Sequence, residues 1–185
     1  MRLRRILGLA ALTAVLATGI PGVASAEPGS APGAASRVTV SDLVLRESVR
    51  GPHVLVPRTW GMKSVDGGGS GSSSTWTNPR AKSQWVALFT GVEVGGWFEL
   101  DGVSGSIDPS GFFPSNAKVT RLSRTMWTYT YAGKPGKSQK LVRGAWFAQL
   151  DGGDPMGYLQ VEVSMDAASQ AAARRIITDF VRRYG

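Results

Sequence analysis

Few residues in this chain are of types that carry out catalysis, because it contains one histidine and no cysteine. Its close acidic pairs are Glu99 with Asp101 and Asp151 with Asp154. Two carboxyl groups are what most glycoside hydrolases need, one as an acid and one as a base or nucleophile. Aspartate is also a common turn residue, because its side chain binds nearby backbone, and Gly102 follows Asp101 directly. We therefore interpret both pairs as turn residues and keep Glu99 and Asp101 as the catalytic candidates of an alternative.

The single imidazole, His53, would need a nucleophile and an orienting acid beside it before it could act as a general base. The sequence shows neither, so a structural or exposed histidine is the favoured interpretation. Asp151-Gly-Gly-Asp154 resembles a piece of a calcium loop, but Ca²⁺ takes about six to eight oxygen ligands and the closing glutamate of an EF-hand is missing. Phosphate-binding glycine loops and the usual hydrolase and zinc-protease motifs are missing too. We therefore expect no cofactor and no metal.

Aromatic and basic residues gather in one part of the chain. Trp127, Tyr129 and Tyr131 alternate with threonines, which places three rings on one face of a strand and two hydroxyls on the other. The basic residues around them are Arg121, Arg124, Lys134, Lys137, Lys140 and Arg143. This is the composition of a stacking platform with a basic rim, although rings on a strand face also form cores. The binding candidates here are Trp127, Tyr129, Tyr131, Lys137 and Lys140.

A sixth binding candidate is Trp76, one of six tryptophans. It follows Gly67–Thr75, a GGGSGSSST run that cannot bury apolar surface and is predicted to be a mobile surface loop. An exposed aromatic beside such a loop is a plausible contact for a sugar ring or a protein partner. The alternative is a loop held down by its own tryptophan.

The first 26 residues have the features of a secretory signal peptide. Residues 2–5 are rich in arginine, Ile6–Ile20 is apolar, and Ala24-Ser25-Ala26 is a cleavage site of small residues before Glu27. The apolar stretch is shorter than the roughly 20 residues of a membrane-spanning helix. We therefore expect a secreted protein, extracellular or associated with the cell wall, with no stable membrane anchor and with the export route open.

Residues 27–36 read as a flexible leader of Pro, Gly, Ala and Ser, and 37–185 as a single domain. Within the domain, three strands are predicted to form an antiparallel meander: 127–131, 141–150 and 158–165. Further strand candidates are Val38–Leu45, His53–Val56, Gln84–Thr90 and Trp97–Leu100. A helix capped by Asp166 has its apolar stripe at Ala173, Ile176, Ile177, Phe180 and Tyr184. The predicted class is α+β, a meander-rich antiparallel sheet with the C-terminal helix packed on one face.

Two segments carry a resemblance to a known architecture. Val54–Trp60 reads VLVPRTW, which resembles the early strand ending in Pro-x-x-Trp of PsbP/Mog1-type proteins, and Ile176–Phe180 resembles their closing helix. The resemblance implies an αβα sandwich. It covers the two ends of the domain and contains no catalytic motif.

Composition and charge restrict the function only broadly. Apolar residues make up 42% and charged residues 18%, which excludes a strongly charged disordered chain. The formal net charge is +8, or +5 without the three arginines of the predicted signal peptide, and it favours anionic partners. The favoured function is a secreted, non-catalytic binding or accessory domain. Its partner is expected to be an anionic or carbohydrate component of the cell envelope or an exported protein, not nucleic acid. The alternatives are a small extracellular hydrolase using a carboxylate pair, and a protein inhibitor or toxin-like factor.

Overall fold

The computed structural model describes residues 37–185 except 69–70, 93–98, 102–105, 134–140 and 152–153. In this part the chain forms a seven-stranded sheet in which every neighbouring pair is antiparallel. In spatial order its strands are β3 (Gly61–Asp66), β4 (Gly71–Thr77), β5 (Trp85–Val92), β11 (Asp154–Ser164), β10 (Leu141–Asp151), β9 (Met126–Ala132) and β8 (Lys118–Arg121). The predicted meander of three strands is confirmed as β9, β10 and β11.

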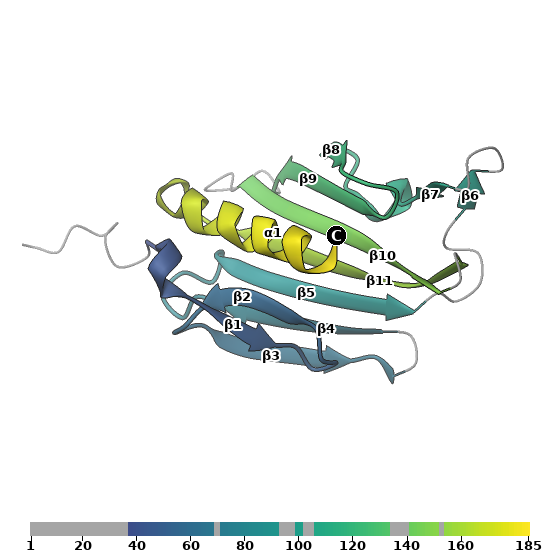
Figure 1. The fold of residues 1–185 in the computed structure, drawn as a ribbon. Coiled ribbons are helices and arrows are strands. Elements are labelled where there is room, and N and C mark those ends of the chain that lie inside the picture. Colours follow the sequence, from purple (N-terminus) through teal and green to yellow (C-terminus); the bar gives the residue numbers. More distant parts are fainter. Residues whose placement is uncertain (1–36, 69–70, 93–98, 102–105, 134–140, 152–153) are drawn as a thin grey trace, which may run out of the picture. The chain divides into compact units, whose positions relative to one another are not determined.

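Shorter elements accompany this sheet. Two strand pairs stand apart from it, β1 (Leu43–Glu47) with β2 (His53–Pro57) and β6 (Glu99–Asp101) with β7 (Ser106–Asp108). The 3₁₀ turns are η2 (Val40–Asp42), η4 (Ser110–Phe112) and η5 (Ala167–Ser169), and the C-terminal helix is α1 (Gln170–Tyr184). Figure 1 shows α1 lying across β10 and β11, with β1 and β2 beside it on the same side of the sheet. The α+β class, with one C-terminal helix on an antiparallel sheet, is confirmed for the described residues.

The face under α1 holds the main hydrophobic core. Strand alternation points Val86 and Leu88 of β5 and Val161 of β11 toward the helix, where all three are buried. On α1, Ile176 and Phe180 of the predicted stripe are buried against them. The predicted cap also forms, since the Asp166 carboxylate accepts the backbone N–H of Ser169 at 2.9 Å in η5, just before the helix.

The opposite face of the sheet carries a second, aromatic cluster. Trp127, Tyr129 and Trp146 are buried there, and Phe112 lies 5.6 Å from Trp146 between ring centroids. Gly144 makes room for this packing, because a Cβ atom at that position would come within 2.1 Å of the Tyr129 ring. The predicted separation of rings and hydroxyls on the two faces of strand 127–131 is therefore correct, and most of the ring surface is core.

The prediction of a surface loop over Gly67–Thr75 is wrong from Gly71 onward. Gly71–Thr77 is β4, paired with β3 on one side and β5 on the other. Small hydroxyl side chains are accommodated there by bonding across strands, as Ser72 does with Thr90 at 2.8 Å. Gly71 has a φ of +136°, and a Cβ atom at that position would come within 2.3 Å of the Thr90 carbonyl. The run lacks an apolar signal, but its backbone hydrogen bonds give it a place in the sheet.

Two smaller differences concern the first half of the chain. The strand expected over Val38–Leu45 begins only at Leu43, because Thr39 and Asp42 close a capping box around η2. The strand expected over Trp97–Leu100 is described only as β6. The predicted signal peptide and leader lie outside the described residues and stay predictions. None of the helices in the described residues is long and apolar enough to cross a membrane.

Candidate functional site

Trp76 lies in the hydrophobic core, which corrects its prediction as an exposed binding residue. Its side chain is 0% exposed, because strand alternation in β4 turns it to the helix face, in register with Val86 of β5. Its indole N–H is buried without a hydrogen-bond partner among the described residues. The expectation of an exposed aromatic beside a mobile loop is therefore wrong, and Trp76 packs instead of presenting itself to a ligand.

The aromatic platform is mostly closed as well. Trp127 is 5% and Tyr129 2% exposed, under the segment that carries Phe112, whereas Tyr131 is half-buried. Two rings of the three are therefore not open to a ligand. The lysine candidates of this group, Lys137 and Lys140, lie outside the described residues.

The catalytic candidates come from β6. The backbone of Glu99 pairs with Asp108 of β7, and that of Asp101 pairs with Ser106. The side chains of these residues lie outside the described part, so the carboxylate mechanism stays a prediction. The side chain of His53 is exposed, while its backbone N–H donates to the Tyr184 hydroxyl at 2.7 Å. This contact ties β2 to the last turn of α1.

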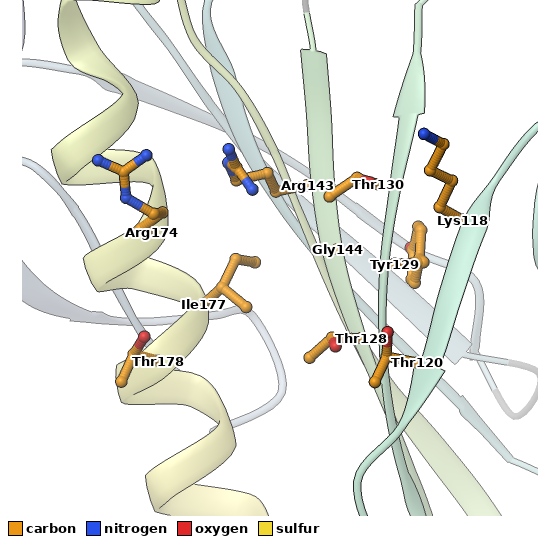
Figure 2. A pocket seen from close by; sticks show the side chains of 10 residues that line it. All are labelled: Lys118, Thr120, Thr128, Tyr129, Thr130, Arg143, Gly144, Arg174, Ile177 and Thr178. Atoms are coloured by element: carbon orange, nitrogen blue, oxygen red, sulfur yellow. The ribbon is translucent and has the colours of Figure 1, made fainter.

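A groove opens on the helix face of the sheet, between α1 and the strands β8, β9 and β10 (Figure 2). Its volume is about 290 Å³. It is lined by residues of all four elements: Lys118, Thr120, Thr128, Tyr129, Thr130, Arg143, Gly144, Arg174, Ile177 and Thr178. We call it the cationic groove, because its charged lining residues are Lys118, Arg143 and Arg174.

Regular secondary structure explains how these side chains meet. In β8 and β9 the pairs Lys118 with Thr130 and Thr120 with Thr128 stand directly opposite each other. Residues two apart share one face of a strand, so this threonine row runs on the helix side while the rings point to the other side. On α1, Ile177 and Thr178 lie three and four residues after Arg174, which places all three on one side of the helix.

The electrostatics of the groove are one-sided. No carboxylate lines it, and within the described residues none of Lys118, Arg143 and Arg174 forms an ion pair. The Arg143 Nε donates to the Gln170 side-chain oxygen at 2.9 Å, which holds the guanidinium in place without neutralising it. Partial burial, and then the nearby charge of Arg174, lower the pKa of Arg143 below its usual value. An anion in the groove would therefore relieve an existing repulsion.

The last turn of the same helix shows the contrasting arrangement. Asp179 is 4% exposed, and its two carboxylate oxygens accept from Arg182 at 2.7 Å and from Arg183 at 3.0 Å. Two of the four arginines of α1 are thus paired with an acid, and Arg175 is exposed. Arg174, three residues before Ile177, faces a groove that supplies no such partner in the described residues.

A polar cluster on the aromatic face is a second candidate. Glu162 accepts from the hydroxyl of Tyr129 at 2.8 Å and from that of Tyr131 at 3.3 Å, and the Gln160 amide donates to the Tyr129 hydroxyl. Burial raises the pKa of Glu162 despite these hydrogen bonds, and burial next to Glu162 raises the pKa of Tyr131 to about 12. The donors already satisfy the carboxylate, so we assign the cluster to stability.

A second hollow, of about 430 Å³, is lined by Arg37, Asp42, Arg58 and Arg80 among others. Here an acid is present, and hydrogen bonds from Thr39 hold the pKa of Asp42 below its usual range. The charge is therefore partly balanced, unlike that of the cationic groove. Among the described residues, no three His, Asp or Glu side chains gather in a way that could hold a metal ion.

Sequence reasoning found part of the cationic groove. It separated the hydroxyls of Thr128 and Thr130 from the rings, and it included Arg143 in the basic cluster. It missed Lys118 and Arg174, because neither belongs to a motif and only the packing of α1 brings Arg174 to the sheet. The signal that could have pointed to them is the threonine row, which left one strand face polar next to several basic residues.

The chain was compared with protein-family models, with curated proteins and with solved structures, and none of the three comparisons finds a match.

Proposed function

We propose that the protein is a secreted, non-catalytic binding domain whose cationic groove takes an anionic ligand. The observation that carries the proposal is the grouping of Lys118, Arg143 and Arg174 without a carboxylate among the lining residues. Arg143 is partly buried beside Arg174, and two cations held this close are unfavourable unless a counter-charge approaches them. An anionic ligand would supply that charge from outside the chain.

The lining supports binding more than catalysis. Its polar members are threonines, cations and Tyr129, whose hydroxyl is bonded to Glu162 on the other face. No carboxylate or imidazole is among the lining residues to act as a general base. Guanidinium groups, in contrast, recognise phosphate and carboxylate through paired hydrogen bonds. The groove thus has the groups for holding an anion.

Secretion is the second part of the proposal, and it is supported by the sequence of residues 1–26 alone. An exported domain with a cationic groove would meet anionic or carbohydrate components of the cell envelope, or other exported proteins. Mass spectrometry of culture supernatant should find an N-terminus at Glu27. Recovery of only the full-length chain, in membranes, would contradict this part.

We also propose that the fold is similar to the αβα sandwich of PsbP/Mog1-type proteins. It is supported by the burial of Trp60 at the end of the VLVPRTW segment and of Ile176 and Phe180 in the closing helix. The described residues contain one α-helix, on one face of the sheet. An experimental structure with a helix on the other face would extend the likeness to the whole sandwich.

Anion binding is tested by isothermal titration calorimetry with inorganic phosphate at low ionic strength. We expect saturable binding by the native protein, and at least about tenfold weaker binding by the double variant Arg143→Gln/Arg174→Gln, because hydrogen bonds to charged groups are lost. For the single variant Arg174→Gln the matched control is Arg175→Gln, which removes one charge from an exposed position of the same helix outside the groove. An equal loss in the control would assign the effect to net charge, and no binding by the native protein would refute the proposal.

A further inference from the structure

The two ends of the cationic groove differ in chemistry. Figure 2 shows Lys118, Arg143 and Arg174 toward one end, while Thr120 and Thr128 lie toward the other. Ile177 lies between these ends on the helix side. A ligand that fills the groove should therefore combine a charged group with an uncharged part, which we call its body.

The spacing of the threonines gives the reach of that body. Thr130 stands opposite Lys118 at the cationic end, and Thr128 stands opposite Thr120 two residues away along β9. Two residues of a strand span about 7 Å. The hydroxyls of Thr120 and Thr128 thus lie beyond the reach of a bare inorganic anion bound at Arg143.

The side chains of the groove select the chemistry of the body. A threonine hydroxyl both donates and accepts a hydrogen bond, which matches the hydroxyl groups of a polyol or sugar. The apolar side chain of Ile177 suits the C–H surface that such a molecule also carries. A fatty acyl chain would leave the hydroxyls unpaired, which costs free energy in a partly enclosed site.

The cationic end selects the charged group. Phosphate offers several acceptor oxygens to the fork of a guanidinium, and a phosphate monoester brings close to two negative charges at neutral pH. Two arginines and a lysine match this charge better than they match a single carboxylate. The volume of about 290 Å³ limits the occupant to one small unit.

We propose that the ligand of the groove is a phosphorylated polyol, with its phosphate held by Arg143, Arg174 and Lys118 and its hydroxyl groups on Thr120 and Thr128. This inference rests on the proposed anion-binding function. The same chemistry can come from a free polyol phosphate or from one repeat of a polymer of such units. In either case the hydroxyl end makes the difference between this ligand and an inorganic anion.

The test is a calorimetric comparison of inorganic phosphate, glycerol 3-phosphate and glycerol at constant ionic strength. We expect glycerol 3-phosphate to bind about tenfold more tightly than phosphate, because it adds hydrogen bonds at the threonine end. Glycerol alone should show no measurable binding. Equal affinities for phosphate and glycerol 3-phosphate would overturn the polyol inference and leave anion binding intact, whereas no binding of either would refute both.

The double variant Thr120→Val/Thr128→Val separates the two ends. Valine keeps the shape of threonine and removes the hydroxyl, and both positions are at least partly exposed in strands. The variant should bind phosphate like the native protein and lose the preference for glycerol 3-phosphate. Retention of that preference would overturn the role of the threonines.

A poly(glycerol phosphate) chain distinguishes the two sources. If it competes with glycerol 3-phosphate at a similar concentration per unit, the groove accepts an internal phosphodiester and the polymer is a source. If only the monomer binds, the groove requires the terminal monoester. Competition by the polymer that persists in Arg143→Gln/Arg174→Gln would place polymer binding elsewhere and would contradict the assignment of the groove.

Discussion

The two faces of β9 differ in whether their polar and charged groups have partners within the described chain. On the aromatic face, the Glu162 carboxylate is bonded to the hydroxyls of Tyr129 and Tyr131. On the helix face, one residue away along the strand, Thr128 and Thr130 border the cationic groove, where no carboxylate of the described residues pairs with the three cations. The polar groups of the aromatic face are hydrogen-bonded to one another. The positive charge of the helix face, in contrast, could be balanced by an anion from outside the chain.

This contrast explains why the more conspicuous residues are not the better candidates. Rings and a half-buried glutamate with a raised pKa are typical of binding and catalytic sites. Here the hydroxyls and the carboxylate are hydrogen-bonded to one another, and Phe113 packs 4.9 Å from Tyr129 between ring centroids. Exposed threonines and cations are ordinary surface residues taken singly, and they become a candidate site only where the packing of α1 gathers them.

The largest effect is expected on the aromatic face, from Trp146→Ala. Trp146 is fully buried and lies 5.4 Å from Trp127 and 5.9 Å from Tyr158 between ring centroids. Replacing such a ring by alanine typically removes about 3 to 5 kcal/mol of the free energy of unfolding, which urea denaturation would measure. Below the melting transition the variant should still bind phosphate, because the groove lies on the other face. A folded variant that has lost phosphate binding would show that the two faces are coupled.

A smaller loss is expected from Tyr129→Phe, which keeps the ring and removes the hydroxyl. Glu162 would lose its shortest hydrogen bond and Gln160 would lose an acceptor. Leaving a buried polar group unsatisfied costs about 1 to 3 kcal/mol. The crossed control is Arg143→Gln/Arg174→Gln, which should weaken phosphate binding at least about tenfold with little change in stability. If Tyr129→Phe weakened phosphate binding and kept full stability, the assignment of the two faces would be reversed.

The parts of the fold that could be predicted from the sequence are those that a local pattern encodes. Alternation of ring and threonine over 127–131 and the helical spacing of Ile176 and Phe180 are local patterns, and they predicted the meander, the helix and its buried stripe. The β4 strand was missed because a Gly/Ser run has no apolar period, although its backbone pairs like any other. Trp76 was misplaced for the same reason, since a residue next to a supposed loop gives no indication of its face.

The groove was beyond sequence reasoning for a different reason. Arg143 and Arg174 belong to separate elements, and their proximity depends on where α1 crosses the sheet. No local period encodes that crossing. The threonine row was visible, but its meaning depended on the neighbours that only the tertiary structure provides.

A moderate effect is expected on the pH dependence of stability, and it comes from Glu162 on the aromatic face. Because the pKa of Glu162 is raised in the folded protein from 4.5, the protonated form is favoured by folding. Its contribution to stability is present below pH 4.5 and is lost as the pH rises through the raised folded value. The substituted side chain of the variant Glu162→Gln stays neutral at every pH. The melting temperature of the variant, relative to that of the native protein, should therefore rise between pH 4 and 7. A constant difference across this range would show that Glu162 titrates normally and is not held by burial.

The smallest effect is expected from Arg174→Gln, which tests the unbalanced charge of the groove directly. The substitution removes the repulsion on Arg143, so stability should stay constant or rise, by no more than about 0.5 kcal/mol since exposed charges are screened by water. Any rise should be seen at low salt and vanish at high salt. Arg175→Gln, the neighbouring exposed arginine, should show no such rise, whereas Arg182→Gln should destabilise because it breaks a bond to the buried Asp179. A clear loss of stability in Arg174→Gln would mean that this arginine serves the fold like Arg182, and the groove would then lose one of the two guanidiniums on which anion binding depends.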